Sequence, residues 1–264
     1  MIARVRPLVV LFVGLLLPLA GCDTRPQGEG PGHRPQELAL SPEQELELGR
    51  KAYREVLGQS KALPLNSKEV KRVTHVGERI AGTMKIEPLM REINLDVKDY
   101  RFEWQFNVLE DKQVNAFCLP GGKVAVFTGL LHVAENDDQL AAVLGHEVAH
   151  ALAHHASERL ARQEREGGGL LAALREKHYD REQESEADHI GLFLMTFAGY
   201  DPGQAVAFWQ RMKQLSDERG QVPEILSDHP SDEKRIRQLE EWVPKAKAAK
   251  KAYDEGRIEP PRGR

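Results

Sequence analysis

The stretch LGHEVAHALAHH, residues Leu144–His155, combines a helix-forming apolar pattern with closely spaced histidines and one glutamate. His146 and His150 are four residues apart. Because a helix advances about 100° per residue, both imidazoles lie on one face, one turn apart. That spacing lets two imidazoles bind one zinc ion while Glu147 reaches a water molecule on the same metal. The stretch therefore predicts a metal helix that carries two ligands and a general base.

The sequence around this stretch predicts how the metal helix is placed. The helix is expected to run from Asn136 to about Glu166, with Asn136 or Asp137 as its N-cap and Gly167–Gly169 as its end. An apolar side turns it toward a core: Leu140, Val143, Leu144 and Val148. A purely structural helix has little reason to turn a charged glutamate and two histidines toward such a packed region.

The third metal ligand does not come from the same helix. A catalytic zinc site takes three protein ligands and keeps one position open for water. In the pattern HExxHxxGxxH, the glycine and the last histidine would fall at Ala153 and Ala156, so that pattern fails. His154 lies about 12 Å along the axis from His146, which is too far to share its metal. We interpret His154 and His155 as histidines on the helix surface or behind the metal ligands.

The segment REQESEADHI offers a carboxylate as the third ligand. Glu184 and Asp188 share one face of the helix that this segment predicts. Glu184 would bind zinc, while Asp188 would accept a hydrogen bond from the far nitrogen of a ligand histidine and fix its tautomer. The alternative is that the whole acidic run is a solvated face, which is what we expect of Glu182 and Glu186.

Helical patterns lie on both sides of the metal helix. Ser41 begins the first as an N-cap, with Pro42 at N1 and Gln44 at N3 completing a capping box. A second helical pattern covers Ser67–Met84. Later helices are expected at about 180–199, from Asp201-Pro202 to about Leu215, and from Ser231 onward.

Two segments predict strands. YRFEWQFNVL, residues 100–109, alternates apolar and polar side chains, which is typical of a strand with one buried face. VNAFCLPGGKVAVFTGLL, residues 114–131, predicts two short strands joined by Pro120-Gly121-Gly122. We therefore expect an α+β fold in which helices surround one small antiparallel sheet.

The N-terminal residues resemble a secretory signal. Arg4 and Arg6 precede an apolar run at Leu8–Leu17, which is shorter than the roughly 20 residues that span a bilayer. The sequence LAGC, ending at Cys22, resembles the bacterial lipobox and predicts a lipid anchor on that cysteine. The alternative is an ordinary signal peptide followed by a chance cysteine. With Cys22 lipidated, Cys118 has no disulfide partner, and we expect it to be a small buried residue.

Composition sets the remaining boundaries. We divide the chain into a signal peptide (1–21), a lipidated cysteine with a flexible tether (22–40), a folded domain (41–245) and a charged, frayed tail (246–264). The formal net charge of −4 and the 6% of aromatic residues argue against a nucleic-acid partner.

Four motifs in the same order resemble one protein family. HEVAH followed by ESEAD resembles the signature of the zinc peptidase family that includes HtpX, the CAAX prenyl protease, mitochondrial Oma and the bacterial envelope proteases LoiP and BepA. VNAFCLPGG and DHPSDEKRIRQL resemble its two other motifs, so the likeness runs from about Ser41 to Trp242. It implies a zincin-like domain of the gluzincin type that binds one zinc ion (Zn²⁺) through His146, His150 and Glu184, with Asp188 as the family's acid.

The resemblance also implies a function. It indicates a membrane-anchored zinc metalloendopeptidase of the bacterial envelope, facing the periplasm, that uses Glu147 to cleave misfolded or envelope proteins. The strand Val114–Cys118 would bind unfolded or extended polypeptides as an added strand, with Asn115 and Ala116 contributing groups there. Envelope assembly machinery is a further expected partner, and the choice between inner and outer membrane stays open.

Two departures from the family pattern narrow the resemblance. The chain shows no apolar run after the signal, so we expect no intramembrane chamber. It also ends soon after the H-P segment, so we expect no helical-repeat module of the BepA kind. The small lipoprotein members such as LoiP are therefore the most similar.

His229 keeps three alternatives open. By resemblance to BepA-like members it can approach the zinc and block the water position, which would keep the enzyme latent. It could instead stabilise the oxyanion, or cap a helix before Ser231. A second function class is a lipoprotein chaperone or assembly factor without proteolytic activity, whose structural zinc would take His229 as a fourth ligand.

Overall fold

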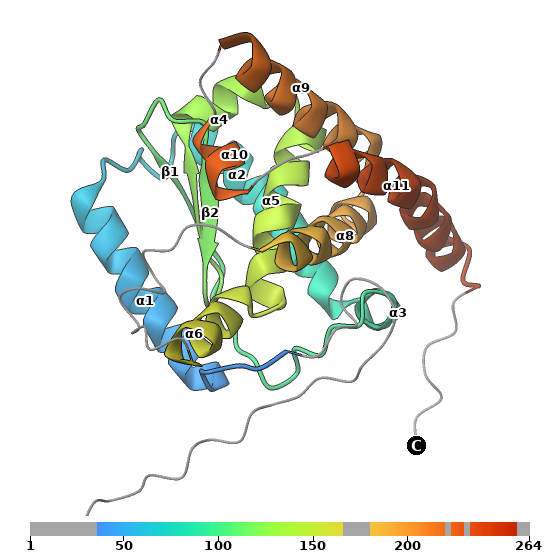
Figure 1. Ribbon diagram of the computed structural model, residues 1–264, viewed down its shortest axis with the longest axis horizontal. Coiled ribbons are helices and arrows are strands. Elements are labelled where there is room, and N and C mark those ends of the chain that lie inside the picture. The colour runs from blue at the N-terminus through green and yellow to red at the C-terminus, as the bar shows by residue number, and fades with distance from the viewer. Residues whose placement is uncertain (1–35, 166–179, 220–222, 230–232, 258–264) are drawn as a thin grey trace, which may run out of the picture.

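The computed structural model describes residues 36–165, 180–219, 223–229 and 233–257 (Figure 1). The expected signal peptide, Cys22 and the glycines at 167–169 lie outside these residues. The elements that precede the metal helix are α1 (Pro42–Gln59), α2 (Lys68–Gly82), η1 (Thr83–Lys85), α3 (Glu87–Glu92), β1 (Gln105–Leu109), β2 (Ala116–Leu119), β3 (Lys123–Phe127) and α4 (Thr128–Val133). The later helices are α5 (Asp137–Leu152), α6 (His155–Arg165), α8 (Arg181–Phe197), α9 (Gly203–Arg219), α10 (Glu224–Asp228) and α11 (Glu233–Asp254).

Helix α5 is the centre of the molecule, with the sheet on one side and α8 on the other (Figure 1). Every residue from Gln139 to Leu152 is buried, so this helix has no solvent face along most of its length. Its N-terminus is capped by Asn136, whose side chain accepts from the backbone N–H of Gln139. The predicted metal helix is therefore also the core helix.

Two glycines set the distance between α5 and α8. A Cβ atom added to Gly191 would lie 2.7 Å from the backbone carbon of Gly145, and one added to Gly145 would lie 2.7 Å from the carbonyl oxygen of Gly191. The backbones touch there because neither residue has a side chain. This contact brings the first turns of α8 against the histidine face of α5.

In the described residues, three strands form one sheet in the order β1-β3-β2. β2 pairs with β3 antiparallel, through a turn in which Gly121 and Gly122 have φ of 73° and 85°. β1 pairs with β3 in parallel, so the expected antiparallel sheet is wrong in detail and the sheet is mixed. The chain reverses its direction between β1 and β2 and again between β2 and β3. β3 therefore runs in the same direction as β1 and lies between β1 and β2. The α+β class itself is confirmed.

The helix expected from Asn136 to about Glu166 is two helices. α5 ends at Leu152, His154 adopts a left-handed φ of 56°, and α6 begins at His155. His154 holds that conformation with its Nδ1 2.8 Å from Glu45 Oε2 and its ring against that of Tyr100, with centroids 3.6 Å apart and the planes tilted by 31°. The sequence gives no glycine at this break, which is why the pattern predicted one helix.

Both ends of the described domain differ from the expected boundaries. Gln36 and Leu38, within the expected tether, are buried, and the backbone N–H of Ala39 bonds to the carbonyl of Ser157 on α6. At the other end α11 continues to Asp254 and buries Ala246, so it includes the start of the segment that we expected to be frayed. No helix in the described ranges combines the length and apolar character that crossing a membrane requires.

Candidate metal centre

Three structural elements bring four metal-binding side chains together. His146 and His150 come from α5, Glu184 from the first turn of α8, and His229 follows α10. One ligand atom from each residue lies within 4.8 Å of all the others. The Nε2 atoms of His146 and His150 are 3.0 Å apart, and His229 Nδ1 lies 2.9 Å from Glu184 Oε1. All four side chains are buried.

The protonation of this cluster fits a bound cation. The nearer partner of His146 Nδ1 is Asp188 Oδ1, at 3.0 Å, so in the neutral ring the proton belongs on Nδ1 and the inner Nε2 carries a lone pair. Burial lowers the pKa of His146, but the nearby carboxylate of Glu184 outweighs it and raises that pKa, so the surroundings favour a positive charge here. Burial lowers the pKa of His150 well below its usual value, which keeps that ring neutral. Lone pairs of two imidazoles that face each other repel unless a cation lies between them. Two imidazoles and a carboxylate are a donor set that zinc takes in proteins.

Glu184 is an ionised carboxylate despite its burial. Burial by itself raises the pKa of Glu184, but His229 and Arg235 outweigh it and hold the pKa well below the usual value. Arg235 Nη1 lies 2.8 Å from Glu184 Oε2. The carboxylate therefore keeps the negative charge that a metal ligand needs.

Glu147 lies beside this cluster, and its carboxyl has a different environment. It is buried, with Oε1 3.3 Å from His229 Nε2. Burial raises the pKa of Glu147 to about 7, against the opposing effect of His229. A carboxyl with a pKa near neutrality is suited to general base and general acid work.

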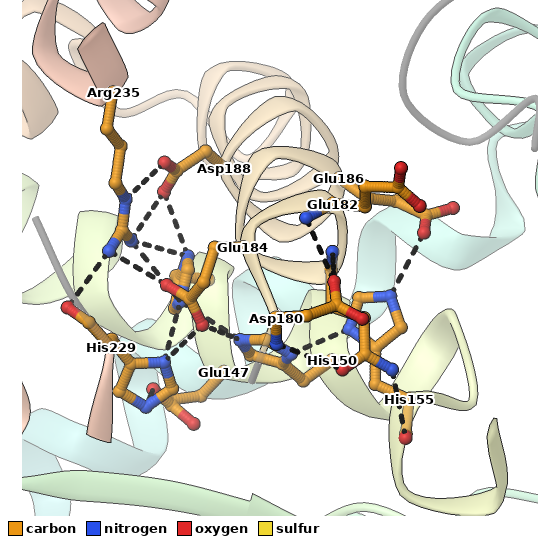
Figure 2. Close-up of polar contacts among 12 residues, drawn as sticks. Glu147, His150, His155, Asp180, Glu182, Glu184, Glu186, Asp188, His229 and Arg235 are labelled. Atoms are coloured by element: carbon orange, nitrogen blue, oxygen red, sulfur yellow. Dashed lines mark hydrogen bonds and ion pairs between the residues drawn. The ribbon is translucent and has the colours of Figure 1, made fainter. Parts of the chain in front are cut away.

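Arg235 on α11 is a site residue that the sequence analysis missed. It forms a bidentate pair with Asp188, in which Nη2 lies 2.8 Å from Oδ1 and Nε contacts Oδ2. Its guanidinium carbon lies 4.2 Å from the ring centre of Trp209. Figure 2 shows Arg235 reaching both Asp188 and Glu184. The arginine stood within the motif DHPSDEKRIRQL, but only the placement of α11 shows that it balances two buried carboxylates.

Asn115 and Ala116 lie at the edge of the sheet, but they are buried. The backbone N–H of Ile225 on α10 donates to the carbonyl of Val114, and Asn115 Nδ2 donates to Asp228 Oδ2 over 2.9 Å. α10 therefore covers the start of the strand at which we expected substrate to bind.

His154 and Glu186 depart from the sequence expectation, whereas His155 lies behind the ligand His150, which is one of the two places expected for it. His154, His155 and Glu186 are all buried, whereas Glu182 is exposed as expected. Glu186 points away from Glu184 because residues two apart on a helix differ by about 200°. The side that it faces is occupied by α6, and its Oε2 lies 3.1 Å from His155 Nε2. The unpredicted break at His154 is the reason for this error.

A core helix with HExxH, joined by a glutamate from a second helix, defines the zinc peptidase class of site. The chain matches the model of peptidase family M48 over residues 82–175 and 167–243, and it belongs to that family. The resemblance seen in the sequence motifs is thus confirmed, and zinc is the metal of this family, for which the four-residue cluster provides the ligands.

Relatives with curated names agree with the family. The chain is 34% identical over 229 residues to the mitochondrial metalloendopeptidase OMA1 of Schizosaccharomyces pombe, which covers 80% of this chain and 64% of that protein. It is 34% identical to the human metalloendopeptidase OMA1, over 59% of this chain and 35% of the relative. It is 25% identical to the beta-barrel assembly-enhancing protease of Escherichia coli, over 50% of this chain and 33% of the relative. The chain thus spans less than two thirds of the length of these relatives.

Proposed function

We propose that this chain is a zinc-dependent metalloendopeptidase that cleaves unfolded or extended polypeptides. The observation that supports this most is the cluster of His146, His150 and Glu184 with the carboxyl of Glu147 directly beside it. The relatives' names, metalloendopeptidase and protease, agree with the same chemistry.

The side chains divide the reaction between them. Bound zinc would supply a Lewis acid that acidifies a water molecule and polarises the peptide carbonyl. Glu147 can accept a proton from a water molecule that attacks the peptide carbonyl and donate it to the amine nitrogen as the C–N bond breaks. Asp188 holds the ring of His146 by its Nδ1–H, and Arg235 keeps Asp188 and Glu184 ionised.

The role of Glu147 has a direct test. Glu147→Gln keeps the shape of the side chain but removes the proton acceptor, so the purified variant should bind zinc like the parent and cleave no casein. Zinc content by atomic absorption, measured on the same sample as cleavage, separates this loss from loss of the metal. A zinc-loaded Glu147→Gln protein that still cleaves casein would exclude this role.

Of the three alternatives for His229, we propose that it keeps the site latent. Its Nδ1 lies 3.2 Å from His146 Nε2 and 2.9 Å from Glu184 Oε1, where it would serve as a fourth ligand. Its Nε2 faces Glu147, the base. As a ligand there, His229 would exclude water from the metal, and α10 lies over the expected substrate strand at the same time. In the active form the segment 223–229 would move away, opening Asn115 and Ala116 to an added strand.

A second function is favoured by the same four donors. A site closed by four protein ligands is typical of structural zinc, as in a chaperone or assembly factor that cleaves nothing. The two functions separate in one assay. A peptidase loses casein cleavage when a chelator removes zinc and regains it when zinc is added, whereas a chaperone suppresses aggregation of an unfolded protein without producing fragments.

We further propose that the chain is a lipoprotein of the bacterial envelope, anchored through Cys22 and facing the periplasm. The support is the sequence LAGC and the name of the E. coli relative, which also suggests envelope assembly machinery as a partner. The OMA1 relatives are named as mitochondrial, so the family occurs in more than one compartment. A Cys22→Ser variant that stays in the membrane fraction and still incorporates labelled palmitate would contradict the anchor.

A further inference from the structure

The two ligand histidines of α5 have different partners at their outer nitrogens. His146 Nδ1 meets the carboxylate of Asp188. His150 Nδ1 meets another imidazole instead, with His155 Nδ1 only 2.7 Å away. The remaining nitrogen of His155, Nε2, lies 3.1 Å from Glu186 Oε2. Glu186 and His155 thus form a chain that ends on the ligand His150, as Figure 2 shows.

The proton positions in this chain follow from its far end. A carboxylate oxygen only accepts hydrogen bonds, so the proton of neutral His155 belongs on Nε2, facing Glu186. Its Nδ1 then carries the lone pair and accepts from His150 Nδ1–H. That leaves the lone pair of His150 on Nε2, the atom that lies 3.0 Å from His146 Nε2. Glu186 therefore selects the metal-binding tautomer of His150 through one intervening ring.

The fold is arranged to allow this contact. In an unbroken helix His155 would stand about 140° around the axis from His150, too far round to meet its outer nitrogen. His154, with its left-handed φ, follows the end of α5 and changes the direction of the chain. As a result His155, the first residue of α6, lies next to His150. Gln183 on α8 holds the new helix, because its Nε2 donates to the carbonyl of His155 and to Glu158 Oε2.

We infer that His155, oriented by Glu186, is a positioning residue for the zinc ligand His150. This inference rests on the proposed zinc site and extends it to a pair of residues behind that site. His155 and Glu186 are both almost completely buried, at 0% and 2% exposure, so water cannot replace either hydrogen bond.

Zinc affinity tests the inference without reference to cleavage. The full chain and its variants are titrated with zinc against a chromophoric chelator of known affinity. Partners of metal-binding histidines are worth about 10- to 100-fold in metal affinity, so His155→Phe should bind zinc weaker by that factor and Glu186→Gln at the low end of it. Glu182→Gln, an exposed carboxylate on the same helix, is the matched control and should bind like the parent.

A rescue variant separates positioning from packing. In His155→Asn the side-chain Oδ1 takes roughly the place of Nδ1 and can accept from His150, although the side chain is smaller than histidine. Phenylalanine fills the space but accepts nothing. Positioning therefore predicts tighter zinc binding for His155→Asn than for His155→Phe, and the reverse order would overturn the inference.

The hydrogen bond itself gives a second readout that needs no variant. In the zinc-loaded parent, labelled with ¹⁵N at histidine, a scalar coupling should join the Nδ1 atoms of His150 and His155. If His155→Phe does not fold, this coupling decides, and its absence would overturn the inference. The inference would also be overturned if folded His155→Phe and Glu186→Gln both bound zinc as tightly as the parent. A parent that binds zinc and shows the coupling but cleaves no polypeptide refutes the proposed function alone.

Discussion

The metal centre has one side built on two packed core helices and another side that follows one short helix. On the first of these, the fixed side, α5 and α8 touch through Gly145 and Gly191, and this contact carries His146, His150 and Glu184. On the other side, His229 stands after the short helix α10, which is tied to the sheet edge by the bonds Ile225–Val114 and Asn115–Asp228, and the carbonyl of His229 accepts from Arg235 Nη1 over 3.2 Å. The difference indicates that three donors are built to stay in place and that the fourth can leave.

The largest effect should follow from breaking the fixed side. A Cβ at Gly191 would lie 2.7 Å from backbone atoms of both Gly145 and His146 on α5, so Gly191→Ala forces α5 and α8 apart. Overpacking of a core costs about 1–3 kcal/mol, and here backbone rather than side chains must move. We expect a clear loss of thermal stability together with weaker zinc binding, measured by calorimetry and by competition with a chelator.

Gly82→Ala is the matched control for Gly191→Ala. Gly82 is also helical, and a Cβ there would contact nothing within 4 Å. Its stability should stay the same or rise by up to about 1 kcal/mol, because alanine favours a helix over glycine. Equal behaviour of the two variants would show that the glycine contact does not set the position of the ligands.

Removing the fourth donor should have the next largest effect, in the opposite direction. His229→Ala vacates the position beside His146 and Glu147, and we expect faster casein cleavage. A tenfold gain corresponds to about 1.4 kcal/mol, which is the order expected for one ligand contact. Slower cleavage by a variant that still binds zinc would instead favour the oxyanion role of His229.

Loosening α10 without touching His229 should give a smaller gain. Asp228→Ala removes the acceptor of Asn115 Nδ2. A single hydrogen bond contributes about 0.5–1.5 kcal/mol, so cleavage should rise by less than it does in His229→Ala. Ser227→Ala, on the same short helix, is the control and should cleave at the parent's rate. A gain in Ser227→Ala equal to that in Asp228→Ala would assign the effect to helix α10 as a whole.

The smallest effect is expected for the ion pair between Arg50 and Glu103, which does not belong to the metal centre. A hydrogen bond from Arg50 holds the pKa of Glu103 to about 2, with Lys123 adding to it. The folded-state pKa lies below the unfolded one, so the pair stabilises the protein above about pH 4.5 and loses that contribution as the pH falls toward 2. In zinc-free protein, Glu103→Gln should flatten the pH dependence of the melting temperature in that window. An unchanged profile would contradict it.

The sequence predicted the parts of the site that depend on helical periodicity alone. His146 and His150 lie on one face one turn apart, and so do Glu184 and Asp188, so each pair could be placed before any tertiary contact was known. Arg235 could not be placed, because its role depends on α11 packing over α8. Nor could His155 and Glu186, since a histidine with positive φ ends α5 where the sequence has no glycine or proline.

The sheet shows the same limit. Alternation of side chains predicted the strand at β1, and Pro120-Gly121-Gly122 predicted the turn between β2 and β3. The order β1-β3-β2 could not be read from these local patterns. It depends on which edge of the hairpin packs beside β1, and that is decided by burial of whole strand faces.

Through Arg235, the metal centre depends on α11, the last helix of the described residues. Loss of α11 would remove the guanidinium that lies against both Asp188 and Glu184. Two like charges would then remain in a dry interior, and the pocket would swell or lose its shape. Loss of α11 would thus disable the centre, although α11 itself supplies none of its four donors.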